Sequence, residues 1–169
     1  MTKFETMWKN YPDKEKIKSM CTNKQSSSNK PFSDYCAIMM SECFIRSSID
    51  MSSFSGNKCW SHSGKKHILL ADDLANSLNR RRPPGFGNME KINTGAFQEA
   101  LKGRTGVIFF KDYWQRGKES FEHRSGDHID LWNSNEISNS SMFYRSLVEF
   151  LGIVSDLNKS KEIWFWSID

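Results

Sequence analysis

The sequence has no long hydrophobic run and little net charge, and each shortage excludes a class of protein. No stretch approaches the roughly 18 consecutive apolar residues of a membrane helix, and residues 1–18 lack the apolar block of a secretory signal peptide. Lys and Arg (24) exceed Asp and Glu (20) by only four, whereas nucleic-acid-binding domains concentrate much more positive charge on one face. We therefore expect neither membrane insertion nor a nucleic-acid partner.

Cysteine is also scarce, with four residues at irregular spacing, which excludes a disulfide framework. They are Cys21, Cys36, Cys43 and Cys59. No C-x-x-C pair is present, and Cys59-Trp-Ser-His62 is a lone C-x-x-H. Zinc would need two more convergent ligands, and the spacing of His67 and Cys43 gives no support for them. We expect a structural role for Cys59, and no metal or other cofactor.

Large apolar side chains, by contrast, are plentiful. Of the 169 residues 37% are hydrophobic and 13% are aromatic, which is enough to bury a core without help from disulfides or metal. No linker, internal repeat or low-complexity tract divides the chain. We therefore expect a single catalytic domain over residues 1–169.

Hydrophobic periodicity predicts both helices and strands. Helical spacing is expected over residues 4–11, 34–45 and 68–78, with a further helical turn at 97–101. Strands are expected at 107–110, 128–132 and 163–166. The stretches 47–64, 80–87 and 111–125 are expected to form loops, because they are rich in Ser and Gly, interrupted by Pro, or strongly polar.

Cys36 lies in the first turn of the second predicted helix, where Ser33 is expected as the N-cap and Asp34 faces the positive end of the helix dipole. A free cysteine on an apolar stripe is usually a core residue. A position in the first turn favours a catalytic role over a core role, because helix N–H groups stabilise a thiolate there. Cys43 lies two turns deeper on the same stripe and lacks this position, so it serves as an internal control.

His128 belongs to the segment Gly126-Asp-His-Ile-Asp-Leu-Trp132. Strand alternation places His128 and Asp130 on one face and directs Ile129 to the other. Asp130 could hold the imidazole in one tautomer and support its protonated form. A cysteine followed by a distant histidine is the order found in papain-like hydrolases, so the pair suggests a thiol nucleophile and its base.

The remaining histidines give weaker signals. His62 and His67 lie among Ser, Gly and Lys, which predicts solvated loop positions, and His123 lies in a charged stretch. None has a carboxylate at strand spacing.

The group that would orient His128 depends on strand register. If Ser134 and Asn135 form a two-residue hairpin turn, Asn133 pairs with Glu136, and Asn139 then lies opposite Asp130 on the face of His128. A three-residue loop would turn Asn139 away. Asparagine orients the histidine in papain-like enzymes, so both Asn139 and Asp130 remain candidates.

Four separated segments resemble the type VI secretion amidase effectors, family four. They are 4–12 (FETMWKNYP), 36–41 (CAIMMS), 101–110 (LKGRTGVIFF) and 126–133 (GDHIDLWN). They occur in the family's order and extend over most of the chain. The resemblance implies an α+β, papain-like fold of NlpC type, with N-terminal helices packed on an antiparallel β-sheet. The family has Asp where Asn139 stands, which leaves the third catalytic position open.

The resemblance also implies a function. Such proteins are DL-endopeptidases that cut the peptidoglycan stem peptide between D-glutamate and meso-diaminopimelate. They are synthesised in the cytoplasm, secreted by the type VI apparatus without a signal peptide, and act in the periplasm of the target bacterium. A cognate immunity protein is the expected partner. The catalytic residues carried over are Cys36 and His128, with Asn139 or Asp130 as the third member.

Two other interpretations fit the same residues. A thiol hydrolase of this fold could act on a protein amide, as a deamidase toxin does. A binding domain without enzymatic activity could contain Cys36 as a core residue only.

Overall fold

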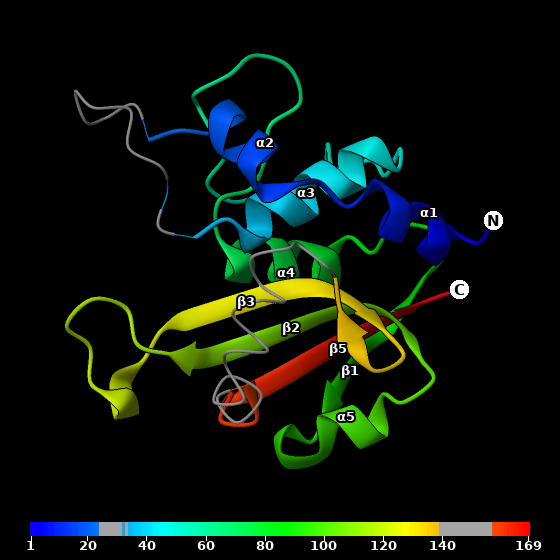
Figure 1. Cartoon of the computed structure of the whole chain (residues 1–169), viewed down its shortest axis with the longest axis vertical. Helices are drawn as coiled ribbons and strands as arrows, with labels where there is room; N and C mark the ends of the chain where they lie inside the picture. Colours follow the sequence, from blue (N-terminus) through cyan, green and yellow to red (C-terminus); the bar gives the residue numbers. More distant parts are fainter. Residues whose placement is uncertain (24–31, 33, 139–156) are drawn as a thin grey trace.

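An antiparallel β-sheet forms the centre of the molecule (Figure 1). The computed structural model describes residues 1–23, 32, 34–138 and 157–169, and within them the sheet has five strands in the order β1-β5-β2-β3-β4. The strands are β1 (Phe86–Ile92), β2 (Thr105–Trp114), β3 (Gly126–Asn133), β4 (Glu136–Ile137) and β5 (Glu162–Ile168). Every neighbouring pair is antiparallel.

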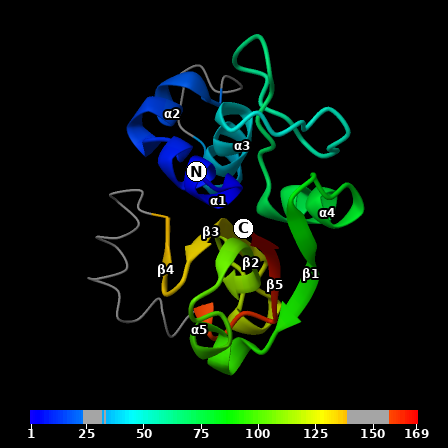
Figure 2. The same cartoon turned by 90° about the vertical axis from the view of Figure 1, so that its right-hand side faces the viewer.

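The helices that precede β1 lie on one side of the sheet, and a short helix that follows β1 lies on the other (Figures 1 and 2). The helices are α1 (Lys3–Asn10), α2 (Lys14–Met20), α3 (Cys36–Arg46), α4 (Ala71–Arg80) and α5 (Phe97–Ala100). The two chain ends meet, since the N–H of Phe4 donates to the carbonyl of Asp169 at 3.3 Å. The expected α+β arrangement of helices on an antiparallel sheet is confirmed.

The sheet is buried on both faces, which explains the uninterrupted apolar run of β2. Val107 and Phe109 pack into the core beneath α3 and α4, whereas Ile108 and Phe110 pack into a second cluster beside α5. Fully burying one such side chain contributes about 1.5–3 kcal/mol. The predicted strand at 107–110 is therefore confirmed, and pairing with β3 and β5 extends it to residues 105–114.

Three elements differ from the sequence expectations. The helix predicted from residue 68 begins at Ala71, because Ile68 instead forms a β-bridge with Lys58. Helix α2 was not expected, since Ile17 is its only buried residue; Asp13 nevertheless caps its N-terminus. Strand β1 begins at Phe86, inside the predicted loop 80–87.

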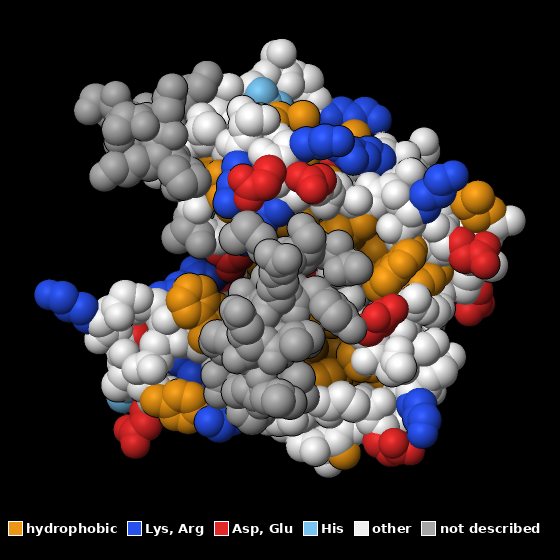
Figure 3. Space-filling model, viewed as in Figure 1, with side chains coloured by type: hydrophobic (Ala, Val, Ile, Leu, Met, Phe, Trp, Pro, Cys, Tyr) orange, Lys and Arg blue, Asp and Glu red, His pale blue; other side chains and the backbone are white. Residues whose placement is uncertain are grey.

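The surface carries both charge signs side by side. Figure 3 shows Lys and Arg interspersed with Asp and Glu over the face seen in Figure 1, in line with the small net charge of +4. In the described part of the chain, no helix has the length and apolar character needed to cross a membrane.

Candidate active site

Cys36 is the first residue of α3, and it is buried, with 8% of its surface exposed. The Asp34 carboxylate accepts a hydrogen bond from the Cys36 N–H at 3.1 Å. Asp34 therefore satisfies one of the N–H groups that a helix start leaves without an intrahelical partner. The N-cap of α3 is Tyr35, which makes no side-chain cap bond, so the expectation that Ser33 caps this helix was wrong; Ser33 itself lies outside the described residues. The predicted position of Cys36, buried and in the first helical turn, is confirmed.

The surroundings of Cys36 favour the neutral thiol in the free protein. Burial raises the pKa of the thiol well above its usual value, and the Asp34 carboxylate raises it further, while the N–H of Ile129 opposes them. Burial disfavours the charged form because the thiolate loses its hydration. The first-turn position alone was expected to stabilise a thiolate. In this geometry Cys36 needs a base to take its proton.

His128 and Asp130 are adjacent on one face of β3, as strand alternation predicts. The imidazole Nε2 lies 3.1 Å from Asp130 Oδ2, and both residues are buried. The other carboxylate oxygen, Oδ1, accepts from the N–H of Leu131 at 2.8 Å and from the Ser138 hydroxyl. Asp130 is thus held at both oxygens and fixes one nitrogen of the imidazole.

Aromatic side chains hold the His128 ring from the neighbouring strand. Phe110 is its cross-strand partner and stacks on it with ring centroids 6.3 Å apart. Tyr113 meets the ring edge-on at 6.2 Å. The imidazole therefore has one packed orientation, with Asp130 at its Nε2.

One pocket brings the predicted residues together. Cys36, His128 and Asp130 line the same cavity of about 20 Å³, together with Tyr11 and Lys14. That volume is close to the space that one water molecule needs. Helix α3 lies directly over β3 (Figure 1), so a cysteine and a histidine 92 positions apart share one site.

The turn after β3 has two residues, as the prediction for Asn139 requires. Asn139 itself lies outside the described residues. Asn133 pairs with Glu136, which makes Ser134 and Asn135 a two-residue turn. Ser134 adopts a φ of 62°, the left-handed conformation that such turns require. Among the described residues, Asp130 is therefore the candidate that contacts His128.

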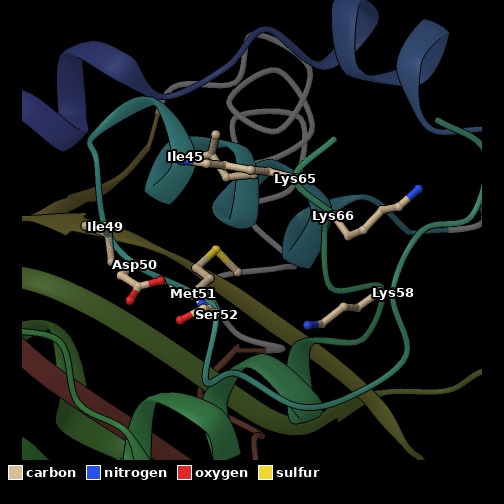
Figure 4. A pocket seen from close by; sticks show the side chains of 8 residues that line it. All are labelled: Ile45, Ile49, Asp50, Met51, Ser52, Lys58, Lys65 and Lys66. Carbon is tan, nitrogen blue, oxygen red and sulfur yellow. Dashed lines mark hydrogen bonds between the residues drawn. The ribbon is translucent and has the colours of Figure 1, made fainter. Parts of the chain in front are cut away.

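A second pocket, of about 220 Å³, has different chemistry (Figure 4). It lies between the C-terminal end of α3 and the loop that follows, and Lys58, Lys65 and Lys66 line it with Asp50. It contains no cysteine or histidine. This pocket therefore offers no nucleophile with an adjacent base.

The comparison with protein families decides the classification. Residues 32–166 match the family model of type VI secretion system (T6SS), amidase effector protein 4, abbreviated Tae4. The chain belongs to the Tae4 family. The resemblance found in the four sequence segments is thereby confirmed, and the protein is assigned to a family of secreted amidase effectors.

Solved Tae4 structures have the same fold. The Tae4 chain of the Salmonella typhimurium Tae4–Tai4 effector–immunity system, in a selenomethionine variant, matches with a TM-score of 0.64 and 17% identity over 100% of this chain and 99% of that one. Tae4 from Enterobacter cloacae matches with a TM-score of 0.61 and 18% identity, over 100% of this chain and 98% of that one. A chain of a Salmonella Typhimurium Tae4–Tai4 complex matches with a TM-score of 0.58 and 18% identity, over 82% of this chain and 87% of that one. None of the curated proteins matches the sequence.

Sequence reasoning missed some features of this Tae4 family member. His67 was expected to be a solvated loop residue, but it is 1% exposed, and its Nε2 lies 2.7 Å from the Glu42 carboxylate. This expectation was wrong because the loop folds back against α3, which its Ser and Gly content could not reveal. Ser138, which bonds Asp130, was missed because it follows a strand of only two residues.

Proposed function

We propose that the protein is a peptidoglycan DL-endopeptidase that cleaves the amide bond between D-glutamate and meso-diaminopimelate of the stem peptide. Membership of an amidase effector family supports the reaction class. The observation that carries the catalytic assignment is the shared pocket of Cys36, His128 and Asp130. Under this proposal Cys36 is the nucleophile, His128 is the base, and Asp130 orients His128.

The tautomer of His128 defines the first step. With the Asp130 carboxylate accepting from Nε2–H, the neutral imidazole would carry its lone pair on Nδ1. We propose that this nitrogen takes the proton of the Cys36 thiol as the sulfur attacks the D-glutamyl carbonyl carbon. The imidazolium that forms is stabilised by Asp130. A neutral resting thiol, as burial favours, suits transfer of the proton during attack.

Backbone N–H groups would stabilise the oxyanion of the tetrahedral intermediate. The Cys36 N–H points at Asp34 Oδ1 in the free protein, so it would exchange that acceptor for the oxyanion when substrate binds. The intermediate collapses as His128 gives its proton to the leaving amine of diaminopimelate. Water then hydrolyses the thioester with His128 again as base, which restores the thiol.

Family membership supports a proposal for the biological setting. We propose that the protein is synthesised in the cytoplasm, delivered by the type VI apparatus, and active in the periplasm of the target bacterium. Solved relatives include complexes of Tae4 with the immunity protein Tai4. A cognate immunity protein that blocks the Cys36 pocket is the partner we propose for this chain.

Product analysis tests the proposed bond. Purified sacculi are incubated with the protein, and the soluble fragments are identified by mass spectrometry. The proposal predicts fragments with a free D-glutamate carboxyl group and a free diaminopimelate amine. Fragments cut at any other bond would contradict it.

The other thiol-dependent interpretation is tested in parallel. Cell lysate treated with the protein is searched for glutamine or asparagine residues converted to their acids. Such conversion on a protein, with intact sacculi, would favour a deamidase toxin over the endopeptidase.

A further inference from the structure

A second group of cysteine and histidine side chains meets away from the Cys36 pocket. Cys21 follows α2, while His62 and His67 belong to the loop between α3 and α4. The Cys21 sulfur lies 2.9 Å from His67 Nδ1, and His62 Nε2 lies 3.2 Å from the same nitrogen. All three donor atoms lie within 4.8 Å of one another. Residues 41 to 46 positions apart therefore converge on one point.

The hydrogen bonds of the two histidines direct lone pairs at each other. His67 Nε2 donates to the Glu42 carboxylate at 2.7 Å, because an ionised carboxylate only accepts. His62 Nδ1 donates to the carbonyl of Ser63 at 2.9 Å. In each neutral ring the other nitrogen is therefore an acceptor. Two such acceptors 3.2 Å apart repel each other unless a hydrogen or a metal ion is shared with them; without metal, the Cys21 thiol 2.9 Å away can donate to His67 Nδ1.

A fourth donor atom lies beside this group, on Cys59. Its buried thiol contacts the Ser61 hydroxyl at 3.0 Å and is near enough to Cys21 to raise the pKa of the Cys21 thiol, after the larger effect of burial. The Cys59 N–H also donates to the carbonyl of His67 at 2.8 Å. The loop that begins at Cys59 and ends at His67 is therefore closed on itself, with a ligand at each end and His62 within it.

We propose that Cys21, Cys59, His62 and His67 bind one zinc ion. Two sulfurs and two imidazole nitrogens are the donor set of closed, tetrahedral structural zinc sites, whose bond lengths place donor atoms about 3.3–3.8 Å apart. The two thiols release their protons to solvent when the metal binds. Glu42 holds His67 from behind, as carboxylates do for zinc-bound histidines. No metal was expected from the sequence, because the spacing of His67 and Cys43 gave no support for two further ligands beside Cys59 and His62.

The ion would join three parts of the helical layer. Cys21 lies at the end of α2, the closed loop carries three ligands, and Glu42 belongs to α3. The Tyr35 hydroxyl donates to the Cys21 carbonyl at 2.8 Å, and Tyr35 directly precedes Cys36. The zinc site therefore supports the helix start that carries the proposed nucleophile, without touching the reaction centre.

Cobalt substitution tests the site directly. The full-length, reduced protein is stripped of metal with a chelator and titrated with Co²⁺ without oxygen. We expect thiolate-to-cobalt charge-transfer absorption and intense visible bands of a tetrahedral ion, saturating at about one equivalent per chain, with Zn²⁺ displacing the cobalt. Cys21→Ser and His62→Gln should each weaken binding at least about tenfold, since each removes a ligand.

Matched controls separate coordination from damage to the fold. Cys43→Ser removes a buried cysteine outside the group, and His123→Gln removes an exposed histidine, so both should bind cobalt like the wild type. His62 is only partly buried, so His62→Gln should remain folded by circular dichroism while losing the spectrum.

Three results would overturn the zinc proposal: a folded, reduced wild type that gives no tetrahedral cobalt spectrum, a His62→Gln protein that keeps that spectrum, or a Cys21–Cys59 disulfide found by mass spectrometry in protein isolated from the cytoplasm. None of these measurements uses peptidoglycan, so they leave the proposed reaction untouched.

Discussion

At the scale of single residues, Cys36 is governed by burial and by its neighbour Asp34. Loss of hydration and the adjacent carboxylate both keep the pKa of the thiol high. Asp34 also accepts from the Cys36 N–H, so one side chain both shapes the helix start and disfavours the Cys36 thiolate. Under the proposed mechanism, reactivity therefore depends on the step in which His128 takes the proton.

Removing the charge of Asp34 should make Cys36 more reactive. Asp34→Asn keeps an oxygen that can accept from the Cys36 N–H but removes the negative charge that raises the thiol pKa. We expect the rate of Cys36 alkylation by iodoacetamide at pH 7.5 to rise several-fold, since each unit of lowered pKa yields about tenfold more thiolate. Peptide mapping by mass spectrometry measures the rate, with Cys43 as reference. An unchanged or slower rate would show that Asp34 does not suppress the thiolate.

Asp127 gives a pH-dependent prediction beside the candidate site. Burial, above all, raises the pKa of its carboxyl group from 3.8 to about 6. The folded protein thus holds this proton more tightly than the unfolded chain does, and folding loses stability as pH rises from about 4 to about 6. Asp127→Asn removes this loss and can still accept from the N–H of Asp112.

The expected gain from Asp127→Asn is on the order of 1–2 kcal/mol in the free energy of unfolding at pH 7.5. It should shrink toward zero at pH 4, where both proteins carry a neutral side chain. Urea unfolding at the two pH values measures it. A gain of equal size at both would mean that the ionisation of Asp127 is not its cause.

Residue-level prediction succeeded where the signal is local in the chain. Strand alternation was enough to pair His128 with Asp130, and helix start signals placed Cys36. The bond from Glu42 to His67 was not predictable, because it joins residues 25 positions apart through a loop without periodicity. The convergence of Cys21 with His62 depends on the same loop path.

At the scale of elements, the central strands were predictable and the edge strands were not. Strands β2 and β5 are buried on both faces, so their apolar runs stand out in sequence. Strand β1 is largely half-buried or exposed along its length and, within the described part of the chain, pairs only with β5, so its sequence FGNMEKI lacks both a clear alternation and an apolar run. Strand β1 forms because its backbone pairs with the edge of β5.

Gly106 tests the close packing of these central strands. A Cβ atom there would meet the carbonyl oxygen of Trp166 and lie 2.7 Å from the ring of Phe165. Gly106→Ala should therefore cost about 3 kcal/mol of stability, which corresponds to a melting temperature about 5–10 °C lower. Differential scanning calorimetry measures the change.

Gly95 provides the matched control for that substitution. It is exposed, and an added Cβ would approach only Asn93 Oδ1, at 3.7 Å. Gly95→Ala should leave the melting temperature within about 2 °C of the wild type. Equal effects of the two substitutions would mean that β2 and β5 are not packed as closely as described.

At the scale of the whole molecule, the fold joins two distant segments into one site by laying α3 across β3. The resemblance implied the fold class, and helix and strand periods, which are legible over short windows, indicated the two segments. Neither could predict the pocket, since the pocket arises from packing between layers. The proposed catalytic roles therefore rest on the shared cavity of Cys36 and His128.

The most direct measurement is the digestion of purified sacculi by wild type, Cys36→Ala and Cys43→Ala proteins of equal concentration and equal foldedness. Because the sulfur of Cys36 forms the proposed thioester, fragment release should fall at least about 10³-fold in Cys36→Ala and stay near wild type in Cys43→Ala. Undiminished release by the Cys36 variant, or its loss only in the Cys43 variant, would contradict the account.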